Sequence, residues 1–159
     1  MLTQARLKEL LHYDPETGIS TWISMRAGVR FGAAAGTLTK IGYIVVKVDG
    51  IDYGVHRLAW LYMTGNFPVD RIDHKNGNGS DNRFSNLRKA NARINGENIR
   101  KARKHNKTGV LGVSHNFKKF QARITVKGKQ MYLGNFKTPE LAHAAYLKAK
   151  RALHEGCTI

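Results

Sequence analysis

An aspartate followed directly by a histidine stands near the start of a polar stretch, residues 71–88, "RIDHKNGNGSDNRFSNLR". Hydrolysis of a phosphodiester requires a base that takes a proton from water and positive charge that neutralises the phosphorus centre and the leaving oxygen. His74 suits the base, because an imidazole gains and loses its proton near neutral pH. Asp73 offers a carboxylate oxygen to a hard cation such as Mg²⁺. The plainer interpretation of the stretch is a surface turn between two strands.

These side chains must be positioned by the elements around them. Successive strand residues point to opposite faces, so a strand through Asp73 and His74 would place the two groups on either side of a phosphate. A second strand is predicted around Leu87, beyond a long polar loop, and a helix follows it. That helix offers three amide oxygens as a second metal ligand, on Asn91, Asn95 and Asn98.

Four elements are predicted ahead of this stretch. Thr3 can cap a helix, and residues 19–23, "ISTWI", are typical of a strand. Asp49–Gly50 lies between two apolar runs and predicts a hairpin turn. Residues 56–65, "HRLAWLYMTG", predict an apolar helix that ends at its glycine.

The charge of the chain is strongly positive, with a formal net charge of +16 over 159 residues. Residues 1–96 carry 13 Lys and Arg against 8 Asp and Glu, whereas residues 97–159 carry 14 against 3. Such an excess indicates a polyanionic partner, with nucleic acid first. No apolar run approaches the roughly 18 residues of a membrane span, and the first residues lack a signal-peptide core, so we expect a soluble cytoplasmic protein.

The pattern changes after a basic bridge at residues 97–108. In residues 120–127, "FQARITVK", apolar and polar residues alternate, which indicates a half-buried strand with one polar face. The surrounding residues predict three strands followed by a helix that Thr138 caps. We therefore expect an α+β protein with a first domain at residues 1–98, a basic linker at 99–108 and a second domain at 109–159.

The motifs "VHRLAW", "DHKNGNGSDNR", "NLR" and a later asparagine together resemble the HNH nucleases of the phage and homing-endonuclease branch, over roughly residues 3–98. The resemblance implies a ββα-metal nuclease domain in which Asp73 binds the metal and His74 is the general base. Asn86 would brace the loop through backbone hydrogen bonds, and Asn95 would be the second metal ligand, with Asn98 as the alternative. Amide and carboxylate oxygens favour Mg²⁺ or Mn²⁺ over Zn²⁺.

Residues 109–153 are similar to the ethylene-response-factor (APETALA-type) DNA-binding domain of plants, through "LGV", "FQARI", "YLGNF" and "TPELAHAAY" in order. In that family a three-stranded sheet reads the major groove and a helix packs behind it. Several of the family's arginines are replaced here by Ser, Asn, Thr and Gln, so the resemblance implies a docking mode but no base preference. The polar strand face and the resemblance together assign DNA contact to Ser114, Asn116, Gln121, Arg123, Thr125, Gln130 and Tyr132.

Further basic side chains are candidates for phosphate contacts, although each could equally be a solvated surface charge. They are Arg57, Arg83, Arg88, Arg100, Lys101, Arg103, Lys104, Lys118 and Lys119. His56 begins the apolar helix, and either packing or direct contact with the active site would explain it.

The combined prediction is a metal-dependent HNH endonuclease of homing type that a C-terminal sheet module directs to double-stranded DNA. The alternative is a DNA-binding regulator that keeps a nuclease fold without catalysis, and a restriction or toxin nuclease would share the same chemistry. One such site cuts one strand at a time, so a monomer would nick. We see no strong dimerisation stripe and expect a monomer without an obligate protein partner.

Overall fold

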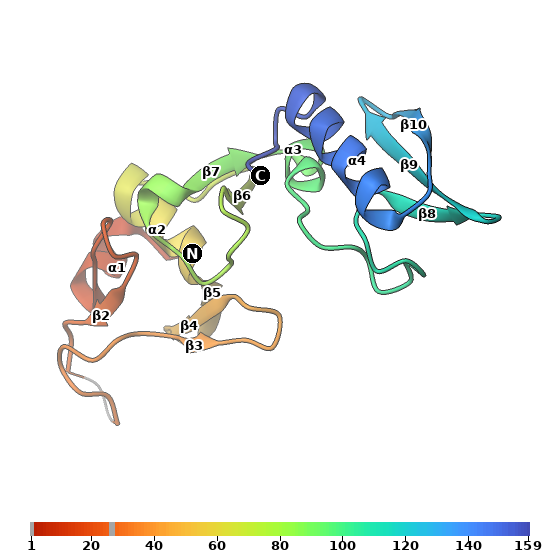
Figure 1. Ribbon diagram of the computed structural model, residues 1–159. Coiled ribbons are helices and arrows are strands. Elements are labelled where there is room, and N and C mark those ends of the chain that lie inside the picture. The colour runs from red at the N-terminus through yellow and green to blue at the C-terminus, as the bar shows by residue number, and fades with distance from the viewer. Residues whose placement is uncertain (1, 26–27) are drawn as a thin grey trace. The chain divides into compact units, whose positions relative to one another are not determined.

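The computed structural model describes residues 2–25 and 28–159 of the chain, which group into two units, Met1–Ala90 and Asn91–Ile159 (Figure 1). The first unit contains two α-helices, one 3-10 helix and seven short strands. In chain order these are α1 (Gln4–Leu10), β1 (Leu11–Tyr13), β2 (Ser20–Trp22), β3 (Thr37–Leu38), β4 (Ile44–Val48), β5 (Ile51–Gly54), α2 (Val55–Thr64), β6 (Arg71–His74), η1 (Phe84–Asn86) and β7 (Leu87–Ala90).

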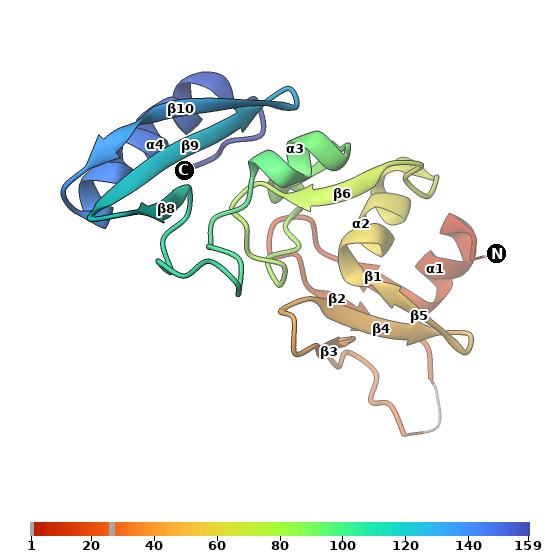
Figure 2. The ribbon, with the colours of Figure 1, turned by 90° about the vertical axis from the view of Figure 1, so that its right-hand side faces the viewer.

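The core of the first unit lies between its two α-helices and the β3–β4–β5 sheet (Figure 2). The predicted cap at Thr3 is present, because its side chain accepts a hydrogen bond from the backbone N–H of Arg6. Gly65 ends α2 in the left-handed conformation, as predicted. The buried residues include Leu7, Leu58 and Val48, each at most 2% exposed. Strand β1 continues directly from α1, and the sequence prediction missed it.

The predicted hairpin turn at Asp49–Gly50 is confirmed. Both residues have positive φ, 48° and 83°, between the antiparallel strands β4 and β5. Such a turn matches the right-handed twist of the strands it joins. The β5 strand runs straight into α2, so the hairpin fixes where His56 enters the helix.

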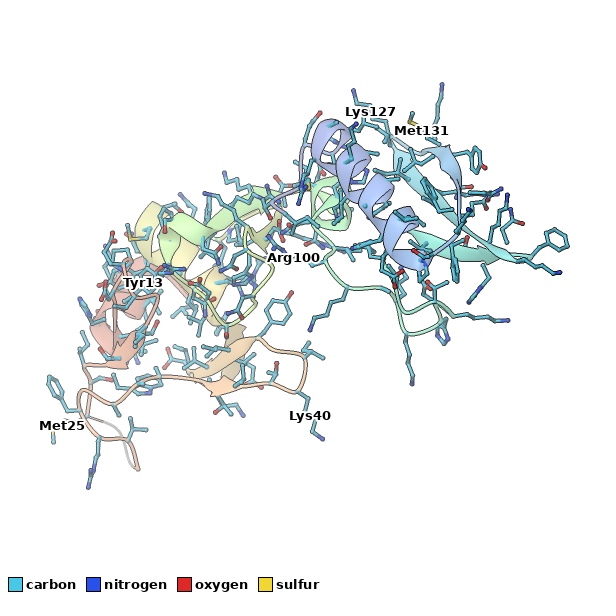
Figure 3. All side chains as sticks on the ribbon, in the orientation of Figure 1. Tyr13, Met25, Lys40, Arg100, Lys127 and Met131 are labelled. Carbon is cyan, nitrogen blue, oxygen red and sulfur yellow. The ribbon has the colours of Figure 1, made fainter. Side chains whose placement is uncertain are left out.

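The second unit contains α3 (Ala92–Glu97), β8 (Val113–Asn116), β9 (Lys119–Val126), β10 (Lys129–Phe136) and α4 (Pro139–Leu153). The strands form an antiparallel sheet in the order β10–β9–β8, and α4 packs on one face, as predicted. Lys127 forms the β9–β10 turn, and Met131 follows on β10 (Figure 3). Thr138 caps α4 through the N–H of Leu141.

The division between the units falls after Ala90, eight residues before the predicted end of the first domain. The predicted linker, residues 99–108, differs from an extended tether because both of its ends are bonded within the second unit. The buried Lys150 of α4 donates to the carbonyl of Ile99, and Asn106 donates to the carbonyls of Val110 and Val113. No helix in residues 2–25 and 28–159 has the length and apolar character needed to span a bilayer.

Candidate active site

Asp73 and His74 occupy adjacent positions on β6, which pairs antiparallel with β7. Both side chains are buried, Asp73 at 8% and His74 at 3% exposure. Arg88 lies opposite Asp73 and donates from Nε and Nη2 to its Oδ2 at 3.0 and 2.8 Å. The expected alternation is present, because the carboxylate meets Arg88 while the imidazole packs elsewhere, against the rings of Tyr43 and His56.

Asn82 fixes the proton arrangement of His74. Its Oδ1 lies 3.1 Å from His74 Nε2, and its Nδ2 donates to the carbonyl of Ser80 at 3.3 Å, which orients the amide. An amide oxygen can only accept, so Nε2 carries the proton of a neutral imidazole and the basic lone pair stands on Nδ1. The hydroxyl of Tyr13 in turn donates to the backbone carbonyl of Asn82 at 2.7 Å. The histidine is therefore held in the form that a general base requires.

His56 contacts the proposed base rather than standing apart from it. Its ring lies edge-on to that of His74, with centroids 5.3 Å apart, and 5.6 Å from that of Tyr43. Burial, then the neighbouring His74 and Arg57, lower the pKa of His56 to about 4. Its Nδ1 is buried without a hydrogen-bond partner among the described residues. His56 is thus a neutral packing neighbour of His74. The position of its ring also explains the glycine at residue 54, because a Cβ there would lie 2.6 Å from His56 Cε1.

Asn86 makes the bracing hydrogen bonds that the HNH resemblance implies. Its Oδ1 accepts from the backbone N–H of Asn76 at 3.0 Å, and its Nδ2 donates to the backbone carbonyl of Asp81 at 2.7 Å. These bonds tie both sides of the polar loop to the start of β7. Gly77 has positive φ, 71°, as a wide turn requires.

Gly79, two residues further on, does not share that left-handed conformation. Its φ lies outside the positive range, and the reason for glycine is a close approach. An added Cβ would lie 2.8 Å from the carbonyl oxygen of Gly42 and 3.1 Å from the ring of Tyr43. The loop is thereby pressed against the segment that also covers His74.

Three arginines considered for phosphate contacts are engaged within the first unit. Arg83 pairs with Asp81, which lowers the pKa of that carboxyl to about 2. Arg57 donates to the carbonyl of Pro68 at 3.3 Å and covers a phenyl ring. Arg88 holds Asp73. Only Arg83, which is exposed, keeps its charge at the protein surface.

The sequence-predicted metal ligands fall in different units of the chain. Asp73, in the first unit, provides a carboxylate oxygen that is paired with the Arg88 guanidinium, and Asn95 lies exposed on α3 of the second unit. Asn98 is buried, and its Oδ1 accepts a hydrogen bond from the hydroxyl of Thr158 at 2.7 Å. Within the described part of the chain no three His, Cys, Asp or Glu side chains gather as a metal site.

The register of the second sheet places the residues predicted to contact DNA on one face. Ala122 and Ile124 are buried toward α4, so the alternate positions of β9 face outward. Arg123 Nη1 donates to Gln130 Oε1 at 3.1 Å across this face. The face comprises Ser114, Asn116, Gln121, Arg123, Thr125, Gln130 and Tyr132, together with Lys119 and Asn135, which the sequence prediction did not place there.

Among the basic linker residues, Arg100 donates to the hydroxyl and carbonyl oxygens of Thr158. Lys101, Arg103 and Lys104 have exposed side chains. Lys118 is exposed at the β8–β9 turn. These four cations are therefore accessible to a polyanion.

The sequence prediction missed Asn82, Tyr13 and Tyr43. Asn82 is one of several asparagines in a polar loop, and no spacing distinguishes it from its exposed neighbours. Tyr13 and Tyr43 are far from the Asp–His pair in the chain, and only folding brings them to it. Their type carries no catalytic signal.

Residues 53–97 match the family model HNH_3, described as HNH endonuclease. The match begins in β5 and ends with α3, and it includes Asp73, His74 and Asn86. No curated protein matches the chain. A solved structure titled "DNA binding and cleavage by the HNH homing endonuclease I-HmuI" is similar at a TM-score of 0.44 and 21% sequence identity, covering 92% of this chain and 88% of that chain.

Proposed function

We propose that the chain is a divalent-metal-dependent HNH endonuclease that hydrolyses phosphodiester bonds of double-stranded DNA. The observation that carries the proposal is the Asp73–His74 pair inside the region that matches the HNH family. Arg88 holds the Asp73 carboxylate by two hydrogen bonds on one side of β6, and the Asn82 amide oxygen orients the His74 imidazole on the other. A structural turn needs neither arrangement.

In the proposed reaction, Nδ1 of His74 takes a proton from water, and the water oxygen attacks phosphorus in line with the 3′ oxygen. The bond from phosphorus to the 3′ oxygen breaks, and the 3′ oxygen takes a proton from solvent water, which leaves a 5′-phosphate and a 3′-hydroxyl. Asp73 and Asn95 would hold Mg²⁺ or Mn²⁺. The bound ion would supply positive charge for the phosphorane and the departing oxygen. The hydrogen bond from Thr158 to Asn98 supports Asn95 as the amide ligand.

The second unit is proposed to dock on DNA through the outward face of β8–β10. Residues 91–159 carry 15 Lys and Arg against 3 Asp and Glu, a net charge of +12, which supplies affinity for phosphates. Arg123, Gln130 and the amides around them present donors and acceptors suited to base edges. The resemblance to the ethylene-response-factor domain supports docking in the major groove. A homing-type nuclease acting as a monomer would cut one strand at each encounter.

The test is a nicking assay on supercoiled plasmid with the full chain in Mg²⁺, in Mn²⁺ and in EDTA. We expect His74→Ala to lose at least roughly 100-fold in rate, the lower range of general-base catalysis, and to bind DNA as before. His12→Ala, an exposed histidine of β1, is the control and should cut normally. Cleavage by His74→Ala at the wild-type rate would refute the assignment.

The alternative function, a DNA-binding regulator without catalysis, predicts a different outcome of the same assay. The wild-type chain would then shift the plasmid in a gel but nick it in neither metal. The buried, arginine-held Asp73 favours the nuclease, because a binding role would not need a buried carboxylate beside DNA.

A further inference from the structure

A fully exposed phenylalanine stands at the tip of the β8–β9 hairpin. Phe117 is 102% exposed and joins Asn116, the end of β8, to the turn before Lys119. Its φ is 51°, in the left-handed region. The ring thus extends from the edge of the sheet whose outward face we propose to bind DNA.

The hairpin turn calls for a positive φ, but a phenylalanine at that position does not serve the fold. A bulky side chain disfavours the left-handed conformation, which glycine adopts at no steric cost. An exposed phenyl ring also forgoes the burial that usually stabilises it. The conformation and the exposure of Phe117 both oppose stability, which points to a role outside the folded chain.

The surroundings of Phe117 identify the partner by charge. Lys118 and Lys119 follow it directly and are exposed. From residue 98 to residue 139 the sequence contains 11 Lys and Arg and no Asp or Glu. Next to the ring, Asn116 donates to Asn135 across the outward face. An aromatic ring that two exposed cations follow, at the edge of an amide-rich sheet, is complementary to a nucleobase and its neighbouring phosphates.

We propose that Phe117 stacks on a nucleobase at the edge of the DNA site, while Lys118 and Lys119 hold the flanking phosphates. The inference rests on the proposed function, in which the second unit binds DNA. The sheet would set the position along the groove, and the ring would add contact area that does not depend on base-edge hydrogen bonds.

The primary test is the affinity of the full chain for a mixed-sequence duplex, measured by anisotropy in EDTA over a salt series. Base stacking predicts a loss of roughly 5- to 150-fold for Phe117→Ala. The salt dependence should keep its slope, because no phosphate contact is removed, whereas Lys118→Ala should reduce the slope. Phe31→Ala, which removes a ring 70% exposed in the first unit, is the matched control and should bind as wild type.

Two further variants separate binding from folding. Phe117→Gly should raise thermal stability, because it relieves the left-handed strain, and should still bind DNA weakly. Phe117→Trp should retain affinity, and stacking should quench the added tryptophan fluorescence when DNA binds. Phe31→Trp should show no such quenching.

Wild-type affinity of Phe117→Ala at every salt concentration would overturn the inference and leave the nuclease proposal intact. A change of oligomeric state in that variant, with DNA binding unaltered, would also overturn it and assign the ring to a contact with a second copy. Failure of the wild-type chain to bind the duplex would instead remove the proposed function, and the inference with it.

Discussion

Replacement of Asn82 by alanine tests the proton arrangement of the base most directly. The amide is 1% exposed, so water cannot take the place of the lost Oδ1 acceptor. A buried N–H left unpaired costs about 1–3 kcal/mol. His74 avoids that cost by moving its proton to Nδ1, the atom that must accept a proton from water. We therefore expect cleavage to slow by roughly 10- to 100-fold, equivalent to about 1.4–2.8 kcal/mol of barrier.

The assay is single-turnover nicking of plasmid over a range of pH. Asn82→Asp keeps an oxygen acceptor but adds negative charge, which favours the protonated imidazole, so the acid limb of its rate profile should move to higher pH. Asn78→Ala removes an exposed side chain of the same loop, which accepts hydrogen bonds from Ser80, and should leave the profile unchanged. If Asn82→Ala cuts at the wild-type rate with the wild-type profile, the hydrogen bond does not set the tautomer.

Three other perturbations follow from the structure. The pKa of His56 is lowered from 6.5 to about 4, so on acidification the unfolded chain is protonated at this residue before the folded chain is. The free energy of unfolding should therefore be greatest above pH 6.5 and should fall between pH 6.5 and 4. After a discount for the partial exposure of the ring, the loss of unfolding free energy is about 2 kcal/mol. Urea unfolding across this pH range measures it, and the pH dependence should be smaller in His56→Gln. Arg88→Met should destabilise the first unit by about 2–4 kcal/mol, because it removes two hydrogen bonds from the buried Asp73, and Asp73→Asn should reduce that effect in a double-mutant cycle. Gly112→Ala should unfold the second unit, since its Cβ would overlap an aromatic ring of α4, whereas Gly128→Ala, at a similar φ in open space, should cost only about 1 kcal/mol in thermal unfolding.

Local signals were sufficient for most of the secondary structure. The Asp49–Gly50 turn, the Thr3 and Thr138 caps and the alternation through β9 each depend on neighbouring residues, and each is confirmed. Strand β1 was missed because its pairing with β2 overrides the helical pattern that precedes it. Gly79 shows what local signals leave open, because glycine serves both left-handed turns and close approaches, and only the packing against Gly42 and Tyr43 distinguishes them.

For the candidate site too, some features could be predicted from the sequence and others depended on the fold. The sequence alone determined the chemistry on offer, because Asp73, His74 and Asn86 are defined by residue type and spacing, and the charge indicated a polyanionic partner. Only the tertiary structure decided how those groups are held. The acceptor for His74, the cation facing Asp73 and the rings of Tyr43 and His56 come from separate segments. Hydrogen bonds and burial act between atoms that are near in space, and spacing along the chain does not encode such pairs.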